Sequence, residues 1–161
     1  MPCGTGKSLT AFWIAYALNA KSIIVAVPSL ALIKQSLEDW TREFVAHHEE
    51  PRPEWLVICS DESTAKIDDN DEFVSDAHSM GIPTTTNIEA ISVFLTDHQI
   101  GRKVIFTTYQ SSDKLAQAAR SSKFSFDLAI LDEAHKTVGV KSKTFATLLS
   151  DKNISISKRL S

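Results

Sequence analysis

Short apolar runs rich in β-branched residues alternate along this chain with segments of helical periodicity. Strands are predicted at Ser22–Val27, Glu54–Cys59, Lys103–Thr108, Phe126–Leu131 and Ile154–Leu160. Helices are predicted at Lys7–Ala20, Ser29–Val45, Asn87–His98, Ser111–Ser121 and Thr144–Leu149, with residues 61–80 as loop. Because the strands are apolar on both faces, helices must cover each face of the sheet they form. The alternation therefore predicts an α/β fold of three layers with a mostly parallel central sheet.

A glycine-rich run that suits phosphate binding precedes the first predicted helix. It consists of Gly4, Thr5, Gly6, Lys7 and Ser8, and is typical of a Walker A motif. Glycines let backbone N–H groups turn inward around phosphate oxygens, and the start of the following helix favours the anion. Lys7 would carry positive charge to the β- and γ-phosphates, and the Ser8 hydroxyl would bind Mg²⁺. The run predicts a nucleotide site of the P-loop NTPase type.

The surroundings of this run differ from the general pattern in two ways. Met1 stands where the pattern has a glycine six residues before the lysine, and no strand precedes the run in this sequence. We therefore expect the chain to be part of a longer protein, with the first strand of the sheet missing from it.

An acidic pair follows a buried strand near the other end of the chain. Asp132 and Glu133 come directly after the predicted strand Phe126–Leu131. In parallel sheets, ligands bind at the carboxyl ends of the strands, which is where a Walker B element supplies its carboxylates. Asp132 would hold Mg²⁺ opposite Ser8, and Glu133 would polarise the attacking water as a general base. The alternative is a solvated acidic pair at the start of a helix.

Together, the two motifs resemble a known family. The run Gly4–Ser8 and the sequence Asp132-Glu133-Ala134-His135 resemble motifs I and II of superfamily 2 helicases and translocases of the DEAH-box type. The resemblance implies a RecA-like domain that binds ATP and Mg²⁺ and hydrolyses ATP with Lys7, Asp132 and Glu133. It also implies that His135 couples the nucleotide to a nucleic-acid site.

Two further stretches resemble family motifs that contact nucleic acid. Residues 28–35 are similar to motif Ia, and residues 107–111 are similar to motif Ib of the type III restriction-enzyme-like branch. The implied contacts to the sugar-phosphate backbone come from Pro28, Ser29, Gln35, Thr107, Thr108 and Tyr109. Hydroxyls, amides and helix N-termini suit such contacts, because they bind phosphate without reading bases.

The resemblance also sets expectations about the domain organisation. Residues 1–161 would form a partial first RecA-like domain, because Ile156–Ser161 resembles the strand that enters motif III and the sequence stops there. The second RecA-like domain would lie elsewhere in the same full-length chain. We expect the isolated 161-residue chain to bind ATP weakly and to show little turnover.

Composition narrows the class of protein but does not select a function. The net charge of −3 gives no overall signal for nucleic acid, and Cys3 and Cys59 are too few for a disulfide framework. No apolar stretch is long enough to cross a bilayer, so a cytoplasmic protein without membrane contact is expected. The three tryptophans, Trp13, Trp40 and Trp55, are predicted to lie in the core.

The favoured function is the ATP-hydrolysing motor domain of a DNA helicase or translocase, with RNA left as an alternative partner. A DNA-translocating subunit of a restriction system would use the same motor without necessarily separating strands. A third hypothesis, from another class, is a catalytically silent remnant that binds nucleotide or DNA.

Overall fold

Six parallel strands form one sheet in the computed structural model, which describes residues 6–47, 53–59, 84–132 and 146–160. Its order is β3-β2-β4-β1-β5-β6, and every pair of neighbours is parallel. The described elements are α1 (Gly6–Ala17), β1 (Ser22–Val27), α2 (Leu30–His47), β2 (Glu54–Ile58), β3 (Thr84–Thr85), α4 (Ile88–Thr96), β4 (Lys103–Thr108), the 3₁₀ turn η2 (Tyr109–Ser111), α5 (Ser112–Ser122), β5 (Ser125–Leu131) and β6 (Ser155–Leu160).

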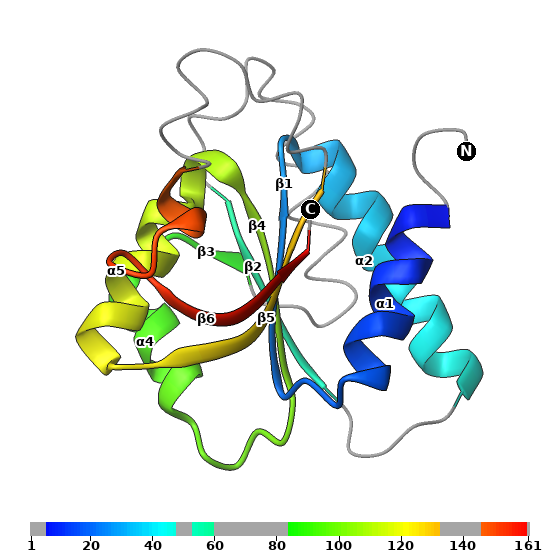
Figure 1. The fold of residues 1–161 in the computed structure, drawn as a ribbon, viewed down its shortest axis with the longest axis horizontal. Coiled ribbons are helices and arrows are strands. Elements are labelled where there is room, and N and C mark those ends of the chain that lie inside the picture. The colour runs from blue at the N-terminus through cyan, green and yellow to red at the C-terminus, as the bar shows by residue number, and fades with distance from the viewer. Residues whose placement is uncertain (1–5, 48–52, 60–83, 133–145, 161) are drawn as a thin grey trace.

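Helices cover both faces of the sheet, as the apolar strands require. Figure 1 shows α1 and α2 on one face and α4 and α5 on the other. Alternate residues of β1 therefore enter different cores: Ile23 and Val25 pack with the α1–α2 side, and Ile24 and Ala26 pack with the α4–α5 side. The predicted three-layer α/β fold is confirmed.

Strand boundaries agree closely with the predictions where both faces are buried. β1 and β4 have the predicted bounds, and all residues of both strands are buried. β3 was not predicted, because a pair of threonines has no periodicity to detect. Asn87 caps α4: its Oδ1 accepts hydrogen bonds from Glu89 N at 2.8 Å and Ala90 N at 3.2 Å. Four residues, 146–149, are helical within the range predicted for the last helix, and the predicted loop 61–80 lies outside the described residues.

The prediction that all three tryptophans lie in the core is wrong for one of them. Trp40 is 1% exposed and packs its ring edge against Phe12 and Phe106. Trp55 is half-buried, with its ring stacked on Phe106. Trp13 is 43% exposed on the outer side of α1. An apolar run in a helix predicts burial only on average, and α1 is covered by α2 and the sheet on one side alone.

A pair of polar residues fixes the start of β1 against the start of β5. Asp127 Oδ2 accepts hydrogen bonds from Lys21 N at 2.7 Å and Ser22 N at 3.3 Å. In return, Asp127 N donates to Ser22 Oγ at 2.9 Å. These contacts join segments more than 100 residues apart. They hold the two strands in the register that brings Ala26 beside Leu131 at their carboxyl ends.

Candidate nucleotide and nucleic-acid site

The carboxyl ends of three adjacent strands collect the predicted motifs at one edge of the sheet. Val27 pairs with Thr108, and Ala26 pairs with Leu131. The residues that follow these strands are Pro28 after β1, Tyr109 after β4 and Asp132 after β5. Parallel strands place such residues at the same edge, where ligands bind in open α/β sheets. Sequence motifs more than 100 residues apart are thus brought together.

The first turn of α1 lies toward the same edge. α1 runs back to β1 through a short connection, and its 12 residues span about 18 Å, close to the roughly 20 Å of the six-residue β1. Figure 1 shows α1 beginning on the side of the molecule where β1 ends. The predicted phosphate-binding residues Gly6, Lys7 and Ser8 belong to this first turn. Gly4 and Thr5 lie outside the described residues.

Ser8 is the residue of this turn that best tests whether a metal ion fits. It is 8% exposed, and its Oγ has no hydrogen-bond partner among the described residues. Buried hydroxyls in folded proteins are nearly always paired, and among the described residues this Oγ is available to bind a further group. A hard cation such as Mg²⁺ prefers oxygen ligands of this kind. Lys7, next to it, is exposed, as a side chain that reaches for phosphate must be.

Asp132 is held by its backbone at the edge of the sheet. Its N–H donates to Ala26 O at 2.9 Å, and its carbonyl oxygen accepts a hydrogen bond from Tyr109 Oη at 2.8 Å. The residue is half-buried. Both backbone groups are therefore fixed, which sets the place from which its carboxylate projects. The predicted general base Glu133 and the predicted coupling residue His135 lie outside the described residues.

The predicted motif Ia residues lie at the start of α2. Ser29 is exposed, and its Oγ lies 3.4 Å from Leu32 N, which donates to it, while Ser29 O accepts from Ile33 N at 3.2 Å. Ser29 therefore begins the helix in the manner of an N-cap. Pro28 and Gln35 are half-buried. An exposed serine at a helix start is a residue type and position suited to a phosphate contact.

The predicted motif Ib residues are buried. Thr107, Thr108 and Tyr109 are each 2% exposed or less. Thr108 Oγ1 donates to Ser111 Oγ at 3.2 Å, so this hydroxyl stabilises the turn. The predicted contacts of these residues with nucleic acid stay predictions. Gln110, which sequence reasoning passed over, is exposed in this turn. Nothing in the sequence separates it from its buried neighbours.

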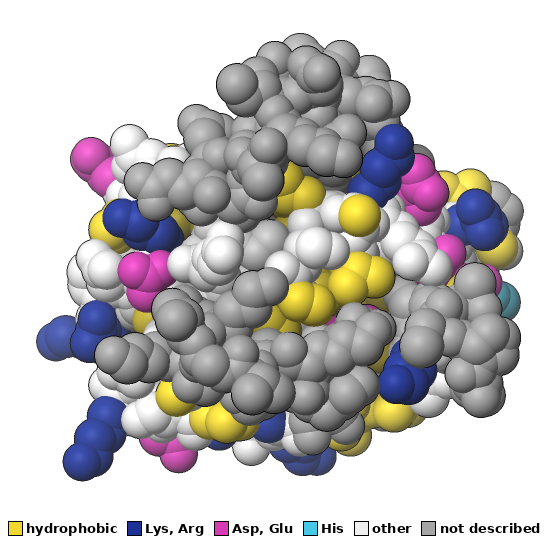
Figure 2. All heavy atoms as spheres, turned by 90° about the horizontal axis from the view of Figure 1, so that it is seen from above, with side chains coloured by type: hydrophobic (Ala, Val, Ile, Leu, Met, Phe, Trp, Pro, Cys, Tyr) yellow, Lys and Arg dark blue, Asp and Glu magenta, His cyan; other side chains and the backbone are white. Residues whose placement is uncertain are grey.

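Figure 2 shows the molecule from the side at which the strands end. On the described part of this face, hydrophobic and uncharged side chains lie near the middle, and most charged side chains lie toward the rim. Among the described residues, no group of three or more His, Cys, Asp or Glu side chains could hold a metal ion.

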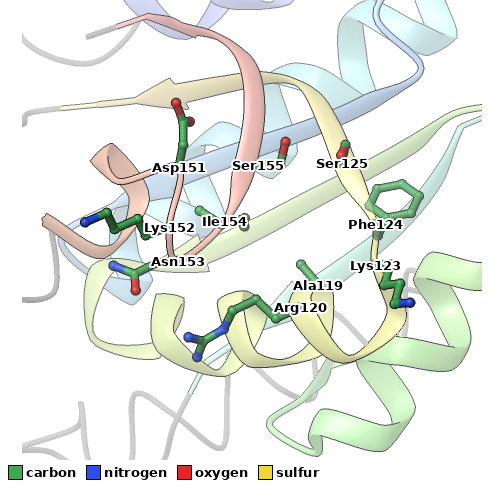
Figure 3. Close-up of a pocket in the computed structure, with 10 residues that line it drawn as sticks. All are labelled: Ala119, Arg120, Lys123, Phe124, Ser125, Asp151, Lys152, Asn153, Ile154 and Ser155. Carbon is green, nitrogen blue, oxygen red and sulfur yellow. The ribbon is translucent and has the colours of Figure 1, made fainter.

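A separate cavity of about 200 Å³ opens at the other end of the sheet, where β5 and β6 begin. Figure 3 shows its lining, which includes Arg120 and Lys123 at the end of α5 and Asp151 and Lys152 before β6. Asp151 pairs with Arg159 Nη2 at 2.7 Å. This cavity lies far from Ser8 and Asp132, because strands begin and end at opposite edges of a parallel sheet. It is distinct from the candidate site.

None of the helices in the described ranges is both long enough and apolar enough to cross a membrane.

Comparison with known proteins gives a family and a fold. Residues 1–154 match the family described as "Type III restriction enzyme, res subunit". No curated protein matches the sequence significantly.

Two solved structures are similar to the chain. One is a nuclease-deletion mutant of the Type ISP restriction-modification enzyme LlaGI in complex with a DNA substrate mimic, with 27% sequence identity and a TM-score of 0.75. The other is the ATP-dependent Type ISP restriction-modification enzyme LlaBIII bound to DNA, with 27% identity and a TM-score of 0.76. The matches cover 97% and 99% of this chain, but only 12% and 10% of those much longer chains.

The parallel sheet, the helices on both faces and the motifs at its carboxyl edge agree with these matches. The chain belongs to the family of type III restriction enzyme res subunits, and its fold is the RecA-like domain of superfamily 2 helicases and translocases.

Proposed function

We propose that this chain is the ATP-hydrolysing motor domain of a DNA translocase that serves a restriction system. The observation that carries the proposal is that the first turn of α1, with the buried unpaired hydroxyl of Ser8, lies toward the edge of the sheet where the backbone of Asp132 is fixed. Membership in the res-subunit family, together with similarity to two restriction-modification enzymes, favours this function over that of a helicase outside restriction.

In the proposed mechanism, each residue has a separate task. The backbone N–H groups of Gly4–Ser8 would surround the phosphates of ATP, and Lys7 would neutralise charge on the β- and γ-phosphates. Ser8 and Asp132 would hold Mg²⁺, which supplies charge neutralisation during phosphoryl transfer. Glu133 would accept a proton from the attacking water, and His135 would link this site to the nucleic acid.

DNA would bind across the same edge of the sheet. Ser29 offers an exposed hydroxyl at the start of α2, close in the fold to the end of β1, and Pro28 and Gln35 belong to the same segment. Contacts of this kind hold the sugar-phosphate backbone without selecting a sequence, as a translocating motor requires. We further propose that turnover needs the second RecA-like domain of the full-length protein and that the protein acts in the cytoplasm.

The decisive experiment is ATP hydrolysis by the full-length protein that contains this chain, measured with and without double-stranded DNA. Wild-type protein should show DNA-stimulated turnover, and Lys7→Ala and Glu133→Gln should each reduce it by about 10²-fold or more. Lys21→Ala is the matched control, because Lys21 is exposed and precedes the opposite end of β1. Turnover that survives both site substitutions would refute the proposal.

A strand-displacement assay separates the two enzyme alternatives. A translocase that does not unwind should displace a protein roadblock or a third strand from duplex DNA, yet leave the two duplex strands paired. Separation of the duplex would favour the helicase alternative. A protein without turnover that still binds nucleotide or DNA would support the silent remnant.

A further inference from the structure

The Tyr109 hydroxyl makes a hydrogen bond to which the proposed mechanism assigns no role. Its hydroxyl donates to the carbonyl oxygen of Asp132 at 2.8 Å, although the two residues follow different strands. Tyr109 follows β4, Asp132 follows β5, and β1 lies between these strands in the sheet. The tyrosine side chain therefore reaches past one intervening strand, across the roughly 10 Å that separates β4 from β5.

The tyrosine is well supported in this position. It is 2% exposed, and it begins the 3₁₀ turn Tyr109–Ser111 directly after β4. Ser112 Oγ donates to Tyr109 O at 2.6 Å, and Thr108 Oγ1 donates to Ser111 Oγ at 3.2 Å. These side-chain contacts hold the turn that carries Tyr109. A buried ring on a turn held by hydrogen bonds has little conformational freedom, so its hydroxyl can act as a hydrogen-bond donor in a fixed position.

The acceptor of this hydrogen bond is the carbonyl of Asp132, which sets the direction of the backbone at the end of β5. Asp132 N is already held by Ala26 O at 2.9 Å. The carbonyl of Asp132 belongs to the planar peptide group that joins Asp132 to Glu133. With both backbone groups of Asp132 bonded, one to β1 and one to Tyr109, the Asp132 carbonyl is held in one orientation.

We propose that Tyr109 is a positioning residue for ATP hydrolysis, which acts by fixing the Asp132–Glu133 peptide group instead of by contacting DNA. This inference rests on the proposed function, because it assigns Asp132 and Glu133 their catalytic tasks. It also gives Tyr109, one of the buried residues of the motif Ib region, a role that its 2% exposure permits. Small displacements of catalytic groups cost large factors in rate, whereas most of the contacts proposed for the nucleotide come from Gly4–Ser8.

The test compares Tyr109→Phe with wild type in the full-length protein. The substitution keeps the ring and removes only the hydroxyl. We expect kcat for ATP to fall by about tenfold, by the same factor with and without DNA, because the peptide group is held in both states. KM for ATP and the Kd of a non-hydrolysable ATP analogue should stay within about twofold of wild type. Tyr16→Phe is the matched control, since it removes a hydroxyl from the half-buried Tyr16 of α1 and should leave kcat unchanged.

Three outcomes would overturn the inference. Wild-type kcat in Tyr109→Phe would show that the hydroxyl positions nothing. A loss confined to the DNA-stimulated rate would assign Tyr109 to DNA contact. Parallel losses in kcat and analogue binding, with a lowered Tm, would show a general structural role. Failure of the proposed function is separate, because then the wild type lacks turnover or Lys7→Ala retains it.

Discussion

Ser22 and Asp127 exchange hydrogen bonds across the start of β1 and β5, with Asp127 N donating to Ser22 Oγ at 2.9 Å and Ser22 N lying 3.3 Å from Asp127 Oδ2. The register of these strands sets where Ala26 O meets Asp132 N. The Ser22–Asp127 pair at one end of the sheet therefore helps to position Asp132 in the candidate site at the other end.

Removing the carboxylate of Asp127 should lower stability. In Asp127→Ala, the N–H groups of Lys21 and Ser22 lose their acceptor, and we expect a decrease of about 1–2 kcal/mol in the free energy of unfolding. Urea denaturation of the 161-residue chain measures it. Glu38→Ala, an exposed change on α2, is the control and should stay within about 0.5 kcal/mol of wild type. Equal stability of both variants would contradict the role given to Asp127.

Trp40 and Trp13 offer a matched pair for testing the core. Trp40 is 1% exposed between α2 and the sheet, whereas Trp13 is 43% exposed on α1. Trp40→Ala should cost about 3–5 kcal/mol because it leaves a large cavity, and Trp13→Ala should cost much less. Thermal unfolding followed by circular dichroism compares the two. Similar losses would mean that the outer side of α1 is covered in solution.

Ser8→Ala should separate stability from function. The Ser8 hydroxyl is buried and unpaired among the described residues, so its removal should leave the ligand-free chain as stable as before or slightly more stable. In the full-length protein, the same substitution should weaken Mg²⁺-dependent ATP hydrolysis by tenfold or more, because it removes the oxygen ligand that we propose for the cation. A variant that loses stability but keeps Mg²⁺-dependent hydrolysis would show that the hydroxyl is structural.

Asp39 should make stability depend on pH. Burial raises the pKa of Asp39 above its usual value, an effect that Arg42 opposes and that Glu38 and Glu43 reinforce. The folded state therefore holds the proton more tightly than the unfolded state does. The free energy of unfolding therefore decreases as the pH rises from the unfolded pKa of 3.8 through the raised pKa of the folded state. Above the folded pKa, the whole of this destabilisation is present.

Asp39→Asn removes this cost, since an amide does not ionise. The variant should have a higher Tm than wild type at pH 7, and the difference should shrink as the pH falls toward 4. Melting curves at several pH values check both statements. Asp113→Asn, an exposed change in the first turn of α5, provides a control for altered net charge. If the Tm advantage of Asp39→Asn over wild type instead grew toward low pH, the Asp39 carboxylate would be favourably paired in the folded state.

Much of the fold could be predicted because its strands are apolar on both faces. Ser22–Val27 and Lys103–Thr108 are completely buried, and their composition alone distinguishes them from the helices around them. The order of the strands is not encoded in such local patterns. β4 lies beside β1 in the sheet, yet β2 and β3 separate these two strands along the sequence.

The candidate site could be predicted only in part, for a related reason. The types of residue in a motif show which chemistry is available, as with Lys7, Ser8 and Asp132. Which of them face the solvent depends on packing by elements distant in the sequence. The sequence assigns Tyr109 to a motif that resembles a nucleic-acid contact, and only the fold shows that it is buried against Asp132, 23 residues away.

The cavity at the amino ends of β5 and β6 has a practical consequence. Lys123 and Lys152 are exposed there, at the edge of the sheet opposite Ser8 and Asp132. A fluorophore or surface tether attached to a cysteine introduced at either position would lie at the edge of the sheet opposite the proposed nucleotide and DNA sites. Single-molecule recordings of movement along DNA could then use this end of the domain as a handle.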